Sequence, residues 1–119
     1  MLKEIGDQPV AVLAVWEPML PTDWTSPTGF VLRRMRDRRV RQYWDPNHLI
    51  ARRMGIDARA PQPEPDCCER HGILWDLAAV YPPGAMWTDR MPAAVLINGP
   101  IVHIAAEIAN RVRAARSGQ

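Results

Sequence analysis

An almost unbroken apolar run at residues 10–16 constrains the fold more than any other feature of the chain. The run is rich in β-branched residues and does not alternate with polar ones, which is typical of a strand buried on both faces. Such strands occupy the interior of parallel sheets, whose strands must be joined by crossover connections, usually helices. The run therefore predicts an α/β fold with this strand at the centre of its sheet.

The rest of the chain alternates between strand and helix patterns. Further strands are predicted at residues 40–44, 73–81, 93–97 and 101–104, and helices at 26–36, 48–54 and 105–116. Ser26 is expected to cap the first helix, and Gly55 to end the second. The Asn98-Gly99 pair predicts a hairpin between the last two strands. Alternating strands and helices followed by a hairpin and a last helix favour an α/β fold with a mixed sheet.

Length and composition are those of one ordinary globular domain. The chain has 119 residues, of which 47% are hydrophobic and 24% are charged. These values exclude a disordered tail, a coiled coil and a disulfide-dense miniprotein. No apolar run is long enough to span a bilayer, and the first residues carry acids where a secretory signal needs basic ones. We therefore expect a cytoplasmic protein.

Two segments resemble parts of the thioredoxin family. The segment from Met91-Pro92 through Asn98-Gly99 is similar to the family's cis-proline, strand, Asn-Gly and strand. The pentapeptide Trp24-Thr25-Ser26-Pro27-Thr28 has the frame of Trp-Cys-Gly-Pro-Cys, with threonine in place of both cysteines. The chain thus resembles a divergent thioredoxin-like protein over residues 9–56 and 91–116. The resemblance implies one domain over residues 1–119, a thioredoxin-like mixed sheet flanked by helices, an insertion at about 57–90, and a cis Met91–Pro92 bond.

The family's standard disulfide exchange needs a thiolate at a helix N-terminus and a second thiol. Thr25 and Thr28 are alcohols, so we expect that chemistry to be absent. What the resemblance leaves is a groove that binds an extended peptide of a protein partner. Its residues would be Trp24, Thr25, Ser26, Thr28, Met91 and Pro92. The alternative is that the threonines belong only to a loop and the first turn of a helix.

Cys67 and Cys68 are the only thiols of the chain. Adjacent cysteines close a strained eight-membered ring, so we expect no structural disulfide here. One interpretation is a pair of small residues where a proline-rich connector meets a strand. The other is a reactive pair, in which Cys67 and Cys68 are catalytic in thiol redox chemistry or bind a soft metal ion with His71 as third ligand. No other cofactor is predicted.

Residues 33–53 hold eight arginines and two aspartates, a net charge of +6 against −4 for the rest of the chain. Such a segment could contact phosphates, but a solvated charged face is the favoured interpretation. His48 and His103 have no partner visible in the sequence, so neither is assigned a catalytic role. Asp76 could be a buried acid of a site, but the favoured interpretation is a residue on the wet face of a strand.

Three functions follow from these patterns. The preferred one is a thioredoxin-fold protein that binds a protein or peptide, or uses Cys67-Cys68 in unconventional thiol redox or soft-metal binding. The second is a non-catalytic structural or interaction module, for which a homo-oligomer is an open possibility. The third, least favoured, is a nucleic-acid accessory protein. No membrane partner is expected, and the sequence leaves open whether the chain is an enzyme.

Overall fold

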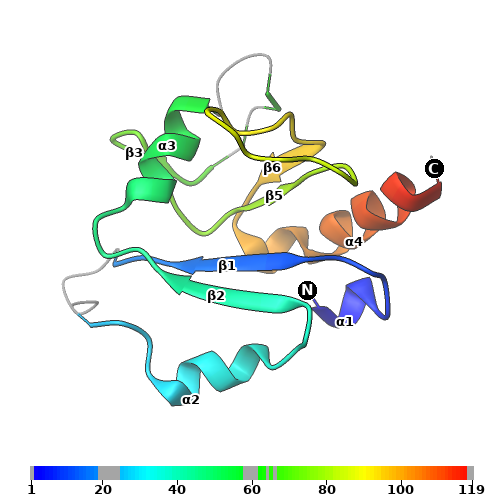
Figure 1. The fold of residues 1–119 in the computed structure, drawn as a ribbon, viewed down its shortest axis with the longest axis horizontal. Helices are drawn as coiled ribbons and strands as arrows, with labels where there is room; N and C mark the ends of the chain where they lie inside the picture. The colour runs from blue at the N-terminus through cyan, green and yellow to red at the C-terminus, as the bar shows by residue number, and fades with distance from the viewer. Residues whose placement is uncertain (1, 19–24, 58–61, 64, 66, 118–119) are drawn as a thin grey trace. The chain divides into compact units, whose positions relative to one another are not determined.

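The computed structural model describes residues 2–18, 25–57, 62, 63, 65 and 67–117 (Figure 1). It contains helices and small sheets, as the α/β prediction requires. The chain divides into two compact units, one of residues 9–50 and one of residues 1–8 together with 51–119. Among the described residues, no helix has the length and apolar character needed to cross a membrane.

The unit of residues 9–50 is built on two parallel strands. Strands β1 (Val12–Trp16) and β2 (Val40–Trp44) pair in register from Val12 opposite Val40 to Trp16 opposite Trp44. The crossover between them contains helix α2 (Gly29–Leu32) and the short 3-10 helix η1 (Arg33–Met35). Both predicted strands are therefore confirmed, and the first lies in a parallel pair as expected.

The prediction that β1 is buried on both faces is wrong. Its side chains alternate between half-buried and exposed, and Leu13 is 66% exposed. Among the described residues this sheet has two strands, and there β1 does not lie between neighbours. The half-buried face is tied to the crossover by Gln42, which accepts from Trp16 Nε1 at 2.9 Å and donates to the Leu32 carbonyl at 3.0 Å.

The two helices that were predicted in the first half of the chain differ from their predicted bounds. Thr28, rather than Ser26, caps α2, because its Oγ1 accepts from Val31 N at 3.4 Å. Helix α3 (Leu49–Asp57) passes through Gly55 instead of ending there. A Cβ on Gly55 would lie 2.1 Å from the Gly72 carbonyl oxygen, so this glycine permits a close approach of two backbones. The division between the two units falls within α3.

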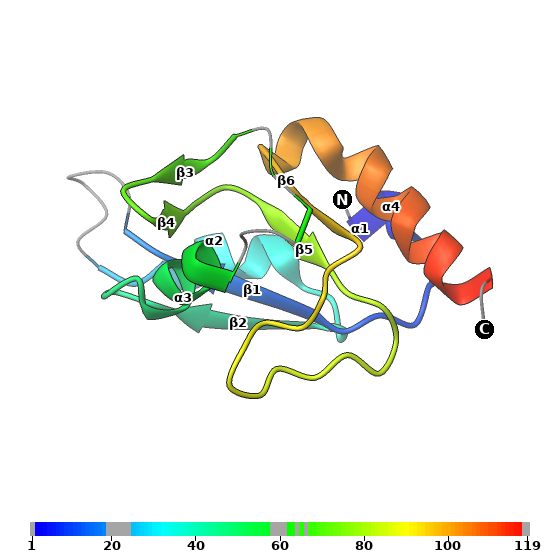
Figure 2. The same ribbon diagram turned by 90° about the horizontal axis from the view of Figure 1, so that it is seen from above.

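The second unit packs around the long helix α4 (Ile101–Ser117). Helix α1 (Leu2–Ile5) lies against α4 (Figure 2), and Arg113 Nη1 donates to the Glu4 carbonyl at 3.0 Å. Buried apolar side chains of α4 and of the strand before it form the core of this unit. The most deeply buried are Ala109, Ile97 and Ile108.

Four short strands complete this unit in two antiparallel pairs. Strand β3 (Glu69–Arg70) pairs with β4 (Ile73–Leu74), and β5 (Ala78–Val80) pairs with β6 (Leu96–Asn98). The single strand predicted at 73–81 is thus divided in two. The division falls at Asp76, whose φ of 48° lies outside the range of strands.

The predicted hairpin at Asn98-Gly99 is wrong. Strand β6 ends at Asn98, and residues 101–104 form the first turn of α4 rather than a strand. The pairing partner of β6 is β5, which precedes it in the chain, so no returning strand is needed after Gly99. The chain is held in this course by Ile101 N, which donates to Asp76 Oδ1 at 3.4 Å.

The predicted cis bond at Met91–Pro92 is also wrong, since the cis peptide bond among the described residues is Gly99–Pro100. Met91–Pro92 lies in an irregular segment that side chains hold on both sides. Met91 N donates to Asp57 Oδ2 at 2.8 Å, and the Pro92 carbonyl accepts from Gln62 Nε2 at 3.1 Å. The Met91–Pro92 bond is therefore trans, which removes one support of the thioredoxin resemblance.

Candidate functional site

Cys67 and Cys68 form a disulfide with each other, contrary to our expectation from ring strain. The backbone makes this closure possible, because Cys68 adopts a φ of 77°, in the left-handed region that few non-glycine residues occupy. The two cysteines differ in exposure: Cys68 is buried, whereas Cys67 is half-buried. The dipeptide is therefore one disulfide, with an inner sulfur on Cys68 and an outer sulfur on Cys67.

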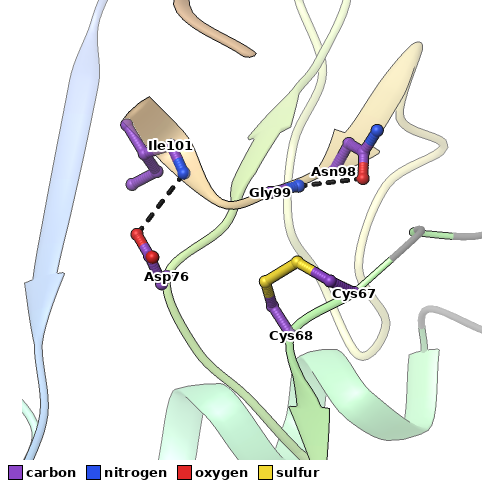
Figure 3. The surroundings of a disulfide bond; sticks show 6 residues. All are labelled: Cys67, Cys68, Asp76, Asn98, Gly99 and Ile101. Atoms are coloured by element: carbon purple, nitrogen blue, oxygen red, sulfur yellow. Dashed lines mark hydrogen bonds between the residues drawn. A yellow bond between two sulfur atoms is a disulfide. The ribbon is translucent and has the colours of Figure 1, made fainter. Parts of the chain in front are cut away.

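The inner sulfur lies against the turn that precedes α4 (Figure 3). A Cβ on Gly99 would be 3.0 Å from Cys68 Sγ and 2.4 Å from the Asp76 carbonyl oxygen. Asn98 Oδ1 accepts from Gly99 N at 2.9 Å and holds this turn from the other side. Three segments distant in sequence therefore converge on the disulfide, and Gly99 is what allows them to approach.

Asp76 connects the same place to the start of α4. Its backbone takes a φ of 48°, and its carboxylate accepts from Ile101 N, the first residue of the helix. One residue earlier, Trp75 N donates to the Cys68 carbonyl at 2.9 Å. The segment 75–76 thus bridges the disulfide to the helix N-terminus, where the helix dipole favours negative charge.

The hairpin that follows the cysteines is fixed by its turn. His71 and Gly72 have φ values of 53° and 79°, and two consecutive positive φ values are the signature of a two-residue type I′ turn. The Glu69 carboxylate accepts from Gly72 N and closes the turn. A hairpin was expected around Asn98-Gly99, but the chain makes one here.

The predicted soft-metal set of Cys67, Cys68 and His71 does not come together as three ligands. Within the part of the chain that the structure describes, no group of three or more ligating side chains could hold a metal ion. The physical reason is that each cysteine sulfur is bonded to the other, so neither is a thiolate. Metal binding by this pair would require its reduced form.

The predicted peptide groove draws on both units of the chain. Trp24 lies outside the described residues, Thr25 and Ser26 are exposed, and Thr28 caps α2. Met91 is buried and Pro92 half-buried, in the other unit. The groove stays a prediction.

A buried carboxylate that sequence analysis missed lies beside Met91. Asp57 Oδ2 accepts from Met91 N at 2.8 Å and from Arg53 Nε at 3.0 Å, and the side chain is 2% exposed. The Met91 hydrogen bond, and then the Arg53 contacts, hold the pKa of Asp57 below its usual value. Tyr81 is near enough for the charge of Asp57 to add to burial, and together they raise the pKa of Tyr81 to about 12. This cluster anchors the irregular segment 81–95. The Arg53–Asp57 pair has the i,i+4 spacing of a helix, but Tyr81 and Met91 are too far from Asp57 in sequence for a local pattern to reveal them.

A second missed cluster lies where the parallel strands of residues 9–50 end. Glu17 Oε2 and His48 Nδ1 are 2.9 Å apart, and both side chains are largely buried. Burial raises the pKa of Glu17 despite the hydrogen bond to His48. Asp45 caps α3 by accepting from Leu49 N and Ile50 N, each at 2.9 Å.

His48 therefore has a partner after all, whereas His103, expected in a strand, is an exposed residue of α4. The Glu-Pro and Asp-Pro pairs after the two strands were the available signal.

None of the protein-family models, curated proteins or solved structures compared with this chain matches it.

Proposed function

We propose that the chain is a thiol–disulfide redox protein whose centre is the Cys67–Cys68 pair, cycling between disulfide and dithiol. The observation that carries the proposal is the disulfide itself, with an outer and an inner sulfur. A pair of cysteines placed only for packing needs neither a bond between their sulfurs nor the left-handed backbone of Cys68 that accompanies it.

The reaction has a definite direction of attack. The thiolate of a small-molecule or protein thiol attacks the half-buried Cys67 Sγ, and the Cys67–Cys68 bond breaks as a mixed disulfide forms. The bonding pair leaves on Cys68 Sγ, which takes up a proton. A second donor thiolate then attacks the mixed disulfide and releases Cys67 as a thiol. Two donor thiols become one donor disulfide, and two electrons and two protons reduce the pair.

The surroundings of Cys68 suit a leaving thiolate. Its sulfur is packed by Gly99, two residues before the first residue of α4, and the positive end of the helix dipole stabilises a nearby anion. Asp76 opposes this effect, because its carboxylate already occupies the same helix end. Asp76→Asn is therefore expected to speed reduction of the disulfide, since the negative charge that competes with the leaving thiolate is removed.

The thioredoxin likeness is a separate hypothesis within this proposal. It is supported by the parallel pair β1 and β2, by the crossover through α2, and by the place of Thr25 to Thr28 directly before that helix. Under this hypothesis the threonine site contributes binding of an extended peptide, and the cysteines outside it contribute the electrons.

The test is a redox titration of the full chain in glutathione buffers of graded ratio, with thiols counted by alkylation and mass spectrometry. A single two-electron transition between disulfide and dithiol is expected, absent from the Cys67→Ser/Cys68→Ser variant. The single variants supply the matched pair: the lone Cys67 of Cys68→Ser should alkylate faster than the lone Cys68 of Cys67→Ser, because Cys68 is the buried one. A pair that stays in one state across all buffers would refute the redox function and favour a non-catalytic interaction module.

A further inference from the structure

Residues 33–41, here called the arginine segment, hold six arginines and a single acid, Asp37. That acid is used within the segment. Arg39 donates to Asp37 Oδ1 from N and from Nε, both at 2.9 Å, and to Oδ2 from Nη2 at 2.6 Å. The other five arginines of the segment are exposed: Arg33, Arg34, Arg36, Arg38 and Arg41.

The remaining acids described in residues 9–50 are engaged elsewhere. Glu17 pairs with His48, and Asp45 caps α3 with both oxygens. Within the described part of this unit, none of the five exposed arginines thus forms an ion pair with a carboxylate, although the charge of Arg38 acts on Asp37. From the sequence, a solvated charged face was favoured because Arg33, Arg34 and Arg36 spread around the predicted helix and the pI of about 8.8 is modest. In the structure, the described carboxylates of this unit interact with other groups, and the exposed arginines form no ion pair with them.

The segment is held in a fixed shape. Asp37 N donates to the Met35 carbonyl and Val40 N donates to the Asp37 carbonyl, each at 3.0 Å. Together with the Asp37–Arg39 pair, these bonds close the turn between η1 and β2. Arg36 and Arg38 therefore project from a pre-organised turn, which reduces the entropy lost when they bind a ligand.

An aromatic side chain continues the segment along β2. Tyr43 is 46% exposed and follows Arg41 by two positions, so both side chains lie on the same face of the strand. An unpaired base can stack on the Tyr43 ring while an adjacent phosphate receives the planar, two-pronged guanidinium of Arg41. An acidic peptide would satisfy the arginines but would have no group that uses the ring in this way.

We propose that the arginine segment and Tyr43 form a binding surface for single-stranded nucleic acid. The five free guanidinium groups contact phosphates, and Tyr43 stacks on a base. Recognition of this kind follows the backbone and is tolerant of sequence.

The test measures fluorescence anisotropy of labelled 12-mer RNA and DNA single strands, and of the corresponding duplex, across a salt series. For single strands, log K falls by about 0.7 per phosphate contact for each unit of log salt concentration, so five contacts predict a slope of about −3.5. Single strands should bind more tightly than the duplex, whose bases are unavailable to Tyr43. The RNA and DNA arms decide which single strand the surface prefers.

Variants with equal charge changes locate the surface. Arg36→Gln/Arg38→Gln should lower the slope to about −2, whereas Arg70→Gln/Arg111→Gln removes two exposed arginines of the other unit and should leave it unchanged. Tyr43→Ala should weaken binding about tenfold with the slope retained. Circular dichroism confirms that each variant is folded.

Three results would overturn the proposal. These are the absence of salt-dependent binding, equal losses in the two double variants, and binding of a poly-glutamate peptide as tightly as of the single strands. The last would identify the surface as one for acidic proteins. None of them bears on the redox titration of Cys67 and Cys68, so the two proposals fail independently.

Discussion

Substitution of Gly99 by alanine tests whether the disulfide, Asp76 and the start of α4 are packed as one unit. The new Cβ would lie 2.4 Å from the Asp76 carbonyl oxygen, 3.0 Å from Cys68 Sγ and 3.1 Å from Leu77 Cβ. The nearest of these atoms belongs to the backbone and cannot rotate away. Gly99→Ala must therefore displace the segment 75–77, the cysteine pair or the turn itself.

Two opposing effects set the magnitude. Gly99 does not have a positive φ, so alanine is allowed at this position and should gain about 0.4–1 kcal/mol by restricting the unfolded chain. Overpacking of a closed site costs about 1–3 kcal/mol, and more where backbone must move. Because a contact of 2.4 Å with a carbonyl oxygen cannot persist, the second effect should dominate. We expect a net loss of about 1–2 kcal/mol in the free energy of unfolding.

The assay is urea unfolding of the oxidised protein, with Gly29→Ala as the matched control. Gly29 opens α2, and its Cβ would meet only the tip of Arg33 at 3.4 Å, so this variant should gain up to about 1 kcal/mol from helix propensity. Displacement of the cysteine pair should also make the disulfide of Gly99→Ala react faster with dithiothreitol. A Gly99→Ala variant that is as stable as wild type would show that the turn yields freely and that the three segments are not packed as one unit.

Three further outcomes follow from the titrating groups and the thiols. Hydrogen bonds from Arg39 lower the pKa of Asp37 from 3.8 to about 2. This group therefore stabilises the fold above its unfolded pKa, and the contribution is lost as the pH falls toward 2. In Asp37→Asn, the acid side of a curve of stability against pH should be flatter. Burial raises the pKa of Tyr81 from 10.0 to about 12, so the fold should lose stability as the pH rises through this range. Tyr81→Phe should remove that loss. It should also remove the step near pH 12 in a titration followed by phenolate absorbance. The reduced Cys67–Cys68 pair should bind As(III) or Hg(II) more tightly than Zn(II) in a calorimetric titration, because two thiolates suit soft low-coordinate ions; equal binding by the double serine variant would contradict this.

Local sequence patterns predicted the elements that are defined by residues close together in the sequence. The strand after Pro9 was predicted from its apolar, β-branched residues, and it lies in a parallel pair as expected. The strand at 40–44 was also predicted. The last helix was predicted from Ile108 and Val112, although it begins four residues earlier than expected. Its early start has a tertiary cause, since Ile101 N is held by Asp76.

Two of the errors share one physical origin, which is that a glycine signal is ambiguous between a turn and a close approach. Gly55 was interpreted as a helix end and Gly99 as a hairpin turn. In the structure each lies against a backbone oxygen, that of Gly72 for the first and that of Asp76 for the second. The residue that requires the glycine is 17 positions away in one case and 23 in the other, so no local window contains it.

The same reasoning explains why the sequence located the candidate redox pair but predicted its state wrongly. The strain of an eight-membered ring is a local argument, and it applies to a free dipeptide. In the folded chain, the Cys68 carbonyl is held by Trp75 N and the Cys68 sulfur is packed by Gly99, so the left-handed backbone at Cys68 is imposed by its neighbours. Because those neighbours also include Asp76, which caps α4, a change in the oxidation state of the pair acts first on the start of that helix. Hydrogen exchange at the amides of Gly99 and Ile101 should therefore respond to reduction before that of the buried residues Ile104 and Ile108 further along the helix.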